Sequence, residues 1–211
     1  MKRSRAIIAT IIILLVLVAD QWLKYRVKTT FYLGEDVEIF SWFHLRFVQN
    51  PGMAFGMELG SKLFLTLFRI VVTCLGIWYI VRRCMRADVP RGYIACVSLV
   101  VAGALGNIID CMLYGEIFTN PYPPQVAQLV PFGTGYGTLF YGQVVDMLYF
   151  PLFSFEWPAW MPWVGGSEFS FFDPVFNIAD AAITVGIIAI LLFYSRYLLG
   201  NEGDDKKEIP D

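Results

Sequence analysis

Four aspartates are the residues of this sequence best suited to chemistry. Asp20, Asp110, Asp146 and Asp180 each lie inside or beside a strongly apolar stretch. An ionised carboxylate inside a membrane costs roughly 3 kcal/mol or more, so we interpret such a residue as part of a functional site. The four come from distant parts of the chain, and a site that uses them requires the fold to bring them together.

Two asparagines accompany the aspartates at helical spacing. Asn107 precedes Asp110 by three residues, and Asn177 precedes Asp180 by three. Residues three apart lie on one face of a helix, so each amide points the same way as its carboxylate. Small residues over 102–106 also allow another backbone to approach closely.

Several of these residues also have a purely structural interpretation. Asp20 and Lys24, four residues apart, can form an ion pair that braces the fold, and we favour this role for them. Asn107 and Asp110 can equally bond across helices or to loop backbone. A purely structural role is hardest to assign to Asp180, because it lies among alanines without a basic neighbour in sequence.

Paired carboxylates predict hydrolysis by activated water. Two carboxyl groups within a few ångströms cannot both ionise easily, so they share a proton. The ionised member takes a proton from water while the neutral one donates to a carbonyl oxygen, as in aspartic proteases. A serine or cysteine nucleophile with a histidine base is not available, because His44 is the single histidine of the chain. We therefore predict an aspartyl hydrolase.

The composition identifies lipid as the solvent of most of the chain. Of the 211 residues, 57% are apolar and only 16% are charged, and the mean hydropathy is +0.57. Soluble domains are closer to a quarter charged. The net charge of −2 argues against a nucleic-acid partner, and one histidine argues against a histidine-rich metal site.

We predict an all-α membrane protein with four transmembrane helices. The apolar stretches long enough to cross a bilayer are 6–23, 63–81, 92–114 and 174–199. Asp173 and Pro174 predict the start of the last one, as N-cap and first helical residue. These helices form one domain over 1–200, followed by a cytoplasmic tail, 201–211, that we expect to be disordered.

The basic residues orient the helices. Ten of the sixteen lie at the N-terminus, between the second and third helices, or after the fourth. Such clusters face the cytoplasm, so both termini are expected there. The segments 25–62 and 115–173 then face outward, and all four aspartates lie near the outer surface.

Both outward segments have patterns of their own. Apolar and polar residues alternate over 37–48, which predicts strands that end in the turn Asn50-Pro51-Gly52. The second segment holds Trp157, Trp160 and Trp163, a residue type that favours the headgroup layer. We expect it to lie along the membrane surface, and the alternative is a flexible insertion without a role.

The sequence around these residues resembles that of the lipoprotein signal peptidases, or signal peptidase II, of bacterial inner membranes. Five blocks carry the resemblance in the right order. Two of them differ from the family pattern, one by a small-residue change and one by Met147 in place of the phenylalanine of VVDF. They are Asp20-Gln21-Trp22-Leu23-Lys24 (DQxxK), Asn50-Pro51-Gly52-Met53-Ala54-Phe55-Gly56 (NxGxAFG), Gly103 to Asp110 (GGxxGNxxD), Val144-Val145-Asp146 (VVDF) and Phe176-Asn177-Ile178-Ala179-Asp180 (FNxAD).

The resemblance implies an endopeptidase that removes the signal peptide of a prolipoprotein, just before the cysteine that carries diacylglycerol. It implies Asp146 and Asp180 as the catalytic pair, no metal and no other cofactor, and inhibition by peptide antibiotics of the globomycin type. It also implies a small extracytoplasmic sheet and contact with membrane lipid. We expect a monomer, because the four predicted spanning helices already enclose the site. Residues with a binding or supporting role would be Asp20, Lys24, Asn50, Gly52, Asn107, Asp110, Asn177 and Ala179.

Two features depart from the family pattern. The residue after Asp110 is Cys111, where the family usually has an arginine. Any contact of that arginine with substrate carbonyls then comes from Arg46 or Arg69, or is absent. The stretches 115–145 and 150–172 are also longer than in compact members, which indicates insertions at the mouth of the site.

Two other functions remain as alternatives. A small transporter could use the acids for proton or cation coupling, but it predicts internal repeats and acids at the bilayer midplane. A non-catalytic scaffold for lipoprotein assembly would have no need of the intact blocks around Asp146 and Asp180.

Overall fold

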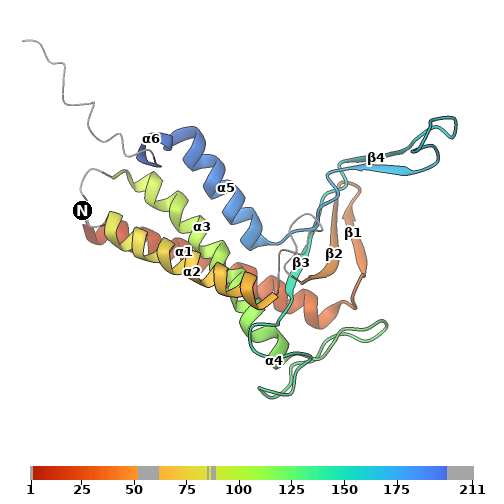
Figure 1. Cartoon of the computed structure of the whole chain (residues 1–211), viewed down its shortest axis with the longest axis horizontal. Coiled ribbons are helices and arrows are strands. Elements are labelled where there is room, and N and C mark those ends of the chain that lie inside the picture. Colours follow the sequence, from red (N-terminus) through yellow and green to blue (C-terminus); the bar gives the residue numbers. More distant parts are fainter. Residues whose placement is uncertain (1, 52–61, 85, 87–88, 199–211) are drawn as a thin grey trace, which may run out of the picture.

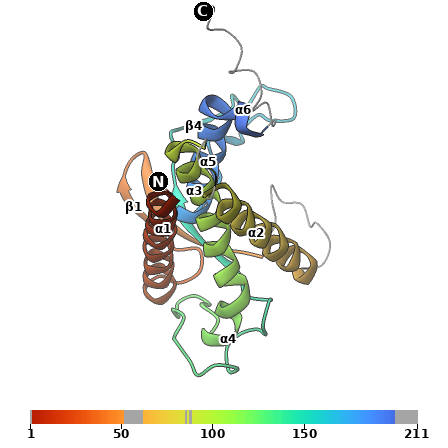
Figure 2. The ribbon, with the colours of Figure 1, turned by 90° about the vertical axis from the view of Figure 1, so that its left-hand side faces the viewer.

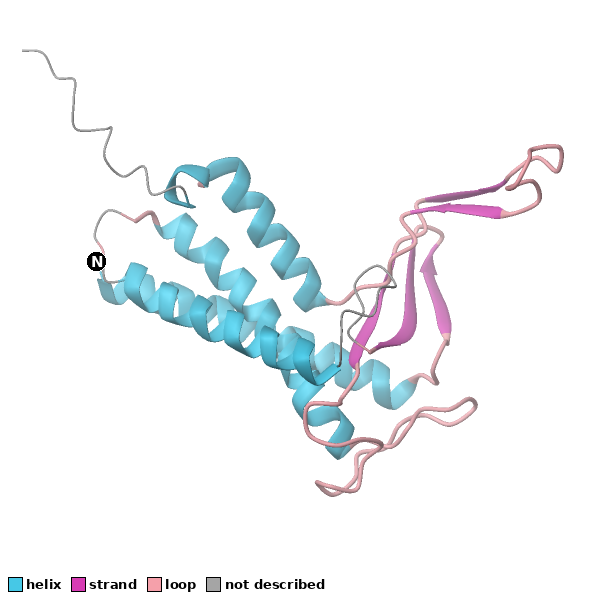
Figure 3. Cartoon of the chain, in the orientation of Figure 1, coloured by secondary structure: helices cyan, strands magenta, loops and turns pink. Residues whose placement is uncertain are grey.

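The structure of the chain is a computed structural model, and it describes residues 2–51, 62–84, 86 and 89–198. Helices gather at one end of the molecule and strands at the other (Figures 1 and 3). Within the described residues, three helical segments are long and apolar enough to cross a membrane. They are α1 (Lys2–Thr30), α2 (Lys62–Cys84), and α3 (Arg91–Ile109) with its continuation through a π-helix (Asp110–Tyr114) and α4 (Gly115–Ile117). A shorter apolar helix, α5 (Ile178–Phe193), is followed by α6 (Ser195–Leu198).

The helix α3 is the centre of the bundle and contacts α1, α2 and α5 (Figure 2). Glycines make the contact with α5 close: a Cβ on Gly103 would lie 2.1 Å from the carbonyl oxygen of Ala179, and one on Gly186 would lie 2.7 Å from that of Cys96. Small residues thus bring the two helices together where lipid supplies no hydrophobic driving force.

The outer surfaces of the helices are apolar, as a bilayer requires. Leu15 and Val18 of α1, Phe64 of α2 and Leu192 of α5 are all more than 60% exposed. The chain is therefore a membrane protein by both composition and surface.

A three-stranded antiparallel sheet covers one end of the bundle, in the order β1 (Asp36–Phe40), β2 (Phe43–Asn50), β3 (Val144–Tyr149). The first two strands overlap the predicted alternating segment. The strand β3, which carries Asp146, was not predicted. It pairs with β2 in a register that sets Val48 opposite Asp146.

The two remaining strands form a separate hairpin. β4 (Phe153–Glu156) and β5 (Glu168–Phe171) pair only with each other, and the hairpin projects beyond the three-stranded sheet (Figure 1).

The predicted start of the last helix is wrong. The N-cap of α5 is Asn177, not Asp173, and the helix begins at Ile178 rather than Pro174. Hydrogen bonding to β3 explains the difference: the N–H group of Phe176 donates to Leu148 O over 3.1 Å, and the N–H group of Leu148 donates to Phe176 O over 2.7 Å. These bonds hold the backbone before Asn177 extended, so the helix cannot start earlier.

The other helix boundaries also differ from the predicted ranges. The first helix extends from Lys2 to Thr30, well beyond 6–23. Its last two turns pack against the sheet, where Val27 shares a buried cluster with Phe47 and Val145. Near the end of the range 92–114, the backbone changes to a π-helix at Asp110. The tail 201–211 lies outside the described residues.

Candidate active site

The pairing of Phe176 with β3 places the two motifs around Asp146 and Asp180 side by side. Asp146 lies on β3 and is 2% exposed, while Asp180 lies in the first turn of α5 and is partly exposed. The charge of Asp180 acts directly on Asp146. The structure therefore brings together two carboxyl groups that are separated by 33 residues between them in sequence.

Two asparagine side chains bridge the carboxyl groups. Asn177 Nδ2 donates to Asp146 Oδ1 over 2.7 Å, and Asn107 Nδ2 donates to Asp180 Oδ1 over 2.8 Å. Asn177 Nδ2 also lies 3.1 Å from Asn107 Oδ1, which links the two amides. The helix cap adds a further connection, because Asn177 Oδ1 accepts from the backbone N–H of Asp180 over 2.9 Å. The amides thus fix both carboxylates from the side of the helices.

Asn50 approaches Asp146 from the sheet. Its Nδ2 atom donates to Asp146 Oδ2 over 3.2 Å. Asn50 ends β2 and lies opposite Val144 in the ladder, so sheet register positions its side chain. The predicted site residue Gly52 lies outside the described residues.

Lys24 is a buried cation with three oxygen partners. Its Nζ atom lies 2.9 Å from Asp20 Oδ2, 2.9 Å from Asp110 Oδ2 and 2.9 Å from Asn107 Oδ1. An ammonium group has three N–H donors, so these contacts satisfy it fully. The predicted ion pair of Asp20 and Lys24 is present, but it is one part of a larger network that reaches the asparagine bridge.

The remaining oxygens of this network hold backbone beside the paired carboxylates. Asp20 Oδ1 accepts from the N–H group of Ala179, 2.9 Å away, and Asp110 Oδ2 accepts from that of Val145, 3.1 Å away. Ala179 directly precedes Asp180, and Val145 directly precedes Asp146. Each supporting aspartate therefore locks the peptide next to one member of the pair.

Sequence analysis missed two residues of the network. Gln21 Nε2 donates to Asp110 Oδ1 over 2.9 Å, and the hydroxyl of Tyr114 donates to Gln21 Oε1 over 3.1 Å. The signal for Gln21 was present, since an amide directly follows Asp20 inside an apolar helix. Tyr114 gave no such signal, because the π-helix decides which way it points.

Lys28 is a second buried cation one turn above Lys24. Among the described residues its Nζ atom has no hydrogen-bond partner. Instead, it lies 5.0–6.0 Å from the ring centroids of Phe47, Tyr114, Phe118 and Tyr136. These rings stabilise the charge through their π faces. Spacing could have found this residue, since Asp20, Lys24 and Lys28 repeat every four positions on one helix.

Burial and, second to it, the neighbouring charge of Asp180 raise the pKa of Asp146 to about 7, against the opposing hydrogen bonds from Asn50 and Asn177. Both causes disfavour a second negative charge at this place. The pair can therefore hold one proton near neutral pH, which is the state that general acid–base catalysis requires.

Arg46 and Arg69 were the two candidates to replace the arginine that the family pattern has at the position of Cys111. Arg69 Nη1 lies 3.4 Å from the sulfur of Cys111, so the guanidinium group reaches from α2 to this position. Arg46 instead stacks over the ring of Tyr149, 5.5 Å from its centroid.

The described residues contain no group of three or more His, Cys, Asp and Glu side chains that could hold a metal ion.

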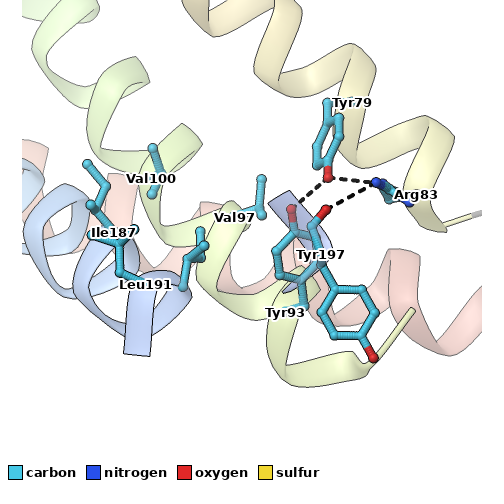
Figure 4. A pocket seen from close by; sticks show the side chains of 9 residues that line it. Tyr79, Arg83, Tyr93, Val97, Val100, Ile187, Leu191 and Tyr197 are labelled. Atoms are coloured by element: carbon cyan, nitrogen blue, oxygen red, sulfur yellow. Dashed lines mark hydrogen bonds between the residues drawn. The ribbon is translucent and has the colours of Figure 1, made fainter. Parts of the chain in front are cut away.

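A pocket of about 390 Å³ lies elsewhere, at the opposite end of the helices (Figure 4). Tyr93, at the start of α3, and Leu191, near the end of α5, contribute to its wall, whereas Asn107 and Asp180 belong to the other ends of these helices. Arg83 also lines it and donates from Nε to the Tyr79 hydroxyl over 2.9 Å. The pocket is thus separate from the paired carboxylates.

Comparison with known proteins places the chain in a family. The family model described as signal peptidase (SPase) II matches residues 12–196. A lipoprotein signal peptidase of Porphyromonas gingivalis (strain ATCC 33277) is 48% identical over 208 residues, which cover 97% of this chain and 89% of that protein. A lipoprotein signal peptidase of Amoebophilus asiaticus (strain 5a2) is 38% identical over 187 residues, covering 86% of this chain and 75% of the relative.

Solved structures agree on the fold. A bacterial membrane enzyme determined by the in meso method at 2.3 Å resolution superposes with a TM-score of 0.60 at 22% identity, covering 96% of this chain and 94% of the other. A second such structure, at 1.9 Å resolution, gives a TM-score of 0.57 at 24% identity, over 87% and 90% of the two chains. The five sequence blocks, the family match and the fold agree: the chain belongs to the signal peptidase II family and is an aspartic protease.

Proposed function

We propose that this protease removes the signal peptide from diacylglyceryl-modified prolipoproteins by cleavage before the lipid-carrying cysteine, with Asp146 and Asp180 as the catalytic pair. The observation that carries this proposal is the asparagine bridge, which holds the two carboxyl groups through Asn177 and Asn107 over 2.7 and 2.8 Å. The names of the relatives support the substrate class.

The proposed reaction uses one water molecule and moves two protons: the one that the carboxyl pair shares and one from the water. The buried Asp146 keeps the proton that the pair shares, and the more exposed Asp180 is ionised. Asp180 takes a proton from water as the water oxygen bonds to the scissile carbonyl carbon, and Asp146 donates its proton to the carbonyl oxygen. When this gem-diol collapses, the C–N bond breaks, the amine nitrogen receives the proton held by Asp180, and Asp146 recovers its own from the hydroxyl.

The supporting residues act by position. Asn107 and Asn177 orient the carboxyl groups, and Asn50 holds Asp146 from the sheet side. Asp20, through Ala179, and Asp110, through Val145, keep the two peptides in place around the Lys24 ammonium group. We also assign Gly52 to substrate binding, on its family motif alone.

Arg69 is the proposed replacement for the family arginine. It is half-buried in a membrane helix, and its guanidinium group lies against Cys111, directly after Asp110. Guanidinium groups have five donors, so Arg69 can still bind carbonyl oxygens of a substrate.

The proposed setting is the outer surface of a bacterial cytoplasmic membrane, which four spanning helices cross with both termini inside. The helix α5 has 16 residues and a length of about 24 Å, and the extended residues before it and α6 after it complete the fourth crossing. In this orientation the arginines Arg82, Arg83 and Arg86 face the cytoplasm. The protein would act as a monomer, in contact with lipid.

Family membership favours this function over a transporter. In addition, the acids gather at one end of α3 and at the start of α5 rather than at mid-helix, where coupling sites lie.

The test is cleavage of a diacylglyceryl-modified precursor by the purified protein, followed by gel shift with and without globomycin. Asp146→Asn and Asp180→Asn should each lower the rate by at least about 10³-fold, because neither amide can exchange the proton. Asp173→Asn is the matched control, since this exposed carboxylate lies away from the pair and accepts a hydrogen bond from the Tyr149 hydroxyl over 3.3 Å. Normal turnover by either Asp146→Asn or Asp180→Asn, in correctly folded protein, would refute the assignment.

A further inference from the structure

The hairpin of β4 and β5 separates the two motifs of the site. It leaves the sheet after Tyr149, three residues past Asp146, and returns to Asn177 three residues before Asp180. The chain thus inserts this element between the two proposed catalytic residues.

One face of the hairpin is entirely aromatic. Phe153 pairs with Phe171, and Phe155 pairs with Phe169. The ring centroids of the first pair lie 4.8 Å apart with their planes at 6°, and those of the second pair lie 5.1 Å apart. On β4 these phenylalanines alternate with exposed Ser154 and Glu156, so the strand is amphipathic. We call the four phenylalanines the aromatic face.

The aromatic face is open rather than covered by protein. Its rings are 36–53% exposed. At the tip, Trp160 is 79% exposed and Trp163 is 102% exposed. Trp163 also has a φ of 66°, a left-handed backbone that is costly for a bulky residue. The fold therefore holds large apolar rings outside its own core at an energetic cost.

The base of the hairpin continues the aromatic surface toward the helices. Ring contacts run from Phe40 through Trp42 to Phe150, and from Phe150 to Phe176 over 5.7 Å. Phe172, which follows the last residue of β5, also contacts Phe176 over 6.0 Å. Phe176 directly precedes the N-cap of α5, a helix whose large apolar side chains are exposed from Val185 onward. The aromatic surface thus leads from the hairpin to the start of a helix that faces lipid.

This continuity identifies the occupant as lipid. Tryptophan and other aromatic rings concentrate at the level of the lipid headgroups, and an amphipathic element with aromatic residues on one side lies in that layer. A site for a protein partner would not need to continue the lipid-facing surface of a spanning helix.

We propose that the hairpin is a membrane-interface arm, whose aromatic face and tip lie among phospholipid headgroups and set the depth of β3 and the start of α5 in the outer leaflet. The location of the arm does not depend on the proposed function, but its effect on cleavage does. An enzyme held at this depth meets the junction between a lipid-anchored cysteine and its signal peptide.

The first test measures location without activity. Full-length protein is placed in phosphatidylcholine nanodiscs with lipids brominated either near the headgroup or near the acyl-chain end. The fluorescence of Trp160 and Trp163 is obtained by subtracting the spectrum of the variant Trp160→Phe/Trp163→Phe from that of the unmodified protein. We expect stronger quenching of this difference by the shallow bromines. If neither brominated lipid quenched the difference fluorescence, but aqueous iodide did, the proposal would be overturned. The tip would then lie in water or on a protein partner.

The second test asks whether the depth of the hairpin in the membrane affects substrate binding, and it measures KM. Replacing Phe153 and Phe155 with serine should raise the KM for a lipid-modified precursor in nanodiscs about three- to tenfold, with kcat little changed. Ser154→Ala is the matched control on the opposite face. An unchanged KM would refute the role in depth. A failure of the catalytic assignment can be told apart from a failure of this proposal. The location of the hairpin does not depend on catalysis, so Asp180→Asn protein should show the same quenching pattern as the unmodified protein in the first test.

Discussion

At the scale of single residues, the stability of the site depends on how its buried charges are paired. Lys24 is fully buried, and its three N–H donors all have oxygen partners, two of them carboxylates. Lys28 is equally buried, but aromatic rings rather than oxygens surround its ammonium group. The two lysines therefore contribute in different ways.

Replacing Lys24 with methionine should destabilise the protein by about 3–5 kcal/mol, because the carboxylates of Asp20 and Asp110 lose their counter-ion while buried. Thermal unfolding in detergent measures the effect. Lys28→Met is the matched control, since it removes a buried charge without leaving an oxygen unpaired, and its effect should be less than half as large. Equal losses in the two variants would contradict this distinction.

The raised pKa of Asp146 makes stability depend on pH. Its pKa is about 7 in the folded protein and about 4 in an unfolded chain. The folded state thus binds the proton more tightly, and this contribution to the free energy of unfolding is lost as the pH rises from about 4 through about 7.

Asp146→Asn removes this titration. We expect the Tm of the variant, relative to the unmodified protein, to increase between about pH 5 and about pH 8, by a few degrees. The altered hydrogen bonds to Asn50 and Asn177 shift the Tm of the variant by a similar amount at every pH. The change of the Tm difference with pH therefore reports the titration of Asp146 alone. A constant difference across this range would show that Asp146 titrates normally.

At the scale of elements, close packing of α3 against α1 and α5 sets the geometry of the network. A Cβ on Gly106 would lie 2.7 Å from Asp20 Oδ2 and 3.1 Å from the Cβ of Ala179. Asp20 cannot move away freely, because it holds both Lys24 and the backbone of Ala179. The helix α3 therefore needs a glycine at this position.

Gly106→Ala should lower kcat about tenfold or more, since small displacements of catalytic groups carry large costs. Cleavage of the lipid-modified precursor provides the measurement. Gly137→Ala is the control, because its Cβ would lie 3.6 Å from Gly115, an ordinary contact. Full activity of the Gly106 variant would mean that Asp20 is free to shift.

The element boundaries show where local sequence patterns fail. Asp173-Pro174 is a good helix start by local rules, yet Asn177 caps α5, because pairing of Phe176 with Leu148 keeps the intervening backbone extended. The strand β3 was missed for the same reason. A short apolar run such as Val144–Tyr149 becomes a strand only when β2 and Phe176 supply partners on both sides.

At the scale of the whole molecule, the charges of the loops predict how the protein sits in the membrane. With both termini in the cytoplasm, green fluorescent protein fused to the C-terminus should fluoresce, and alkaline phosphatase fused there should be inactive. Phosphatase inserted near Thr134, in the segment between α4 and β3, should be active. An active phosphatase at the C-terminus would reverse the orientation.

The sequence by itself determined the membrane environment, the acidic chemistry, and the local pairs Asp20–Lys24 and Asn177–Asp180, because composition and helical spacing act over a few residues. Only the tertiary structure decided that Lys24 joins Asp20 to Asp110 and Asn107, that Asn177 reaches Asp146, and that Lys28 lies in a ring of aromatic side chains. The bond between Lys24 and Asn107, for example, joins residues 83 positions apart. The formation of these contacts depends on the register of β2 with β3 and on the close approach of α3 to α5, which no local pattern records.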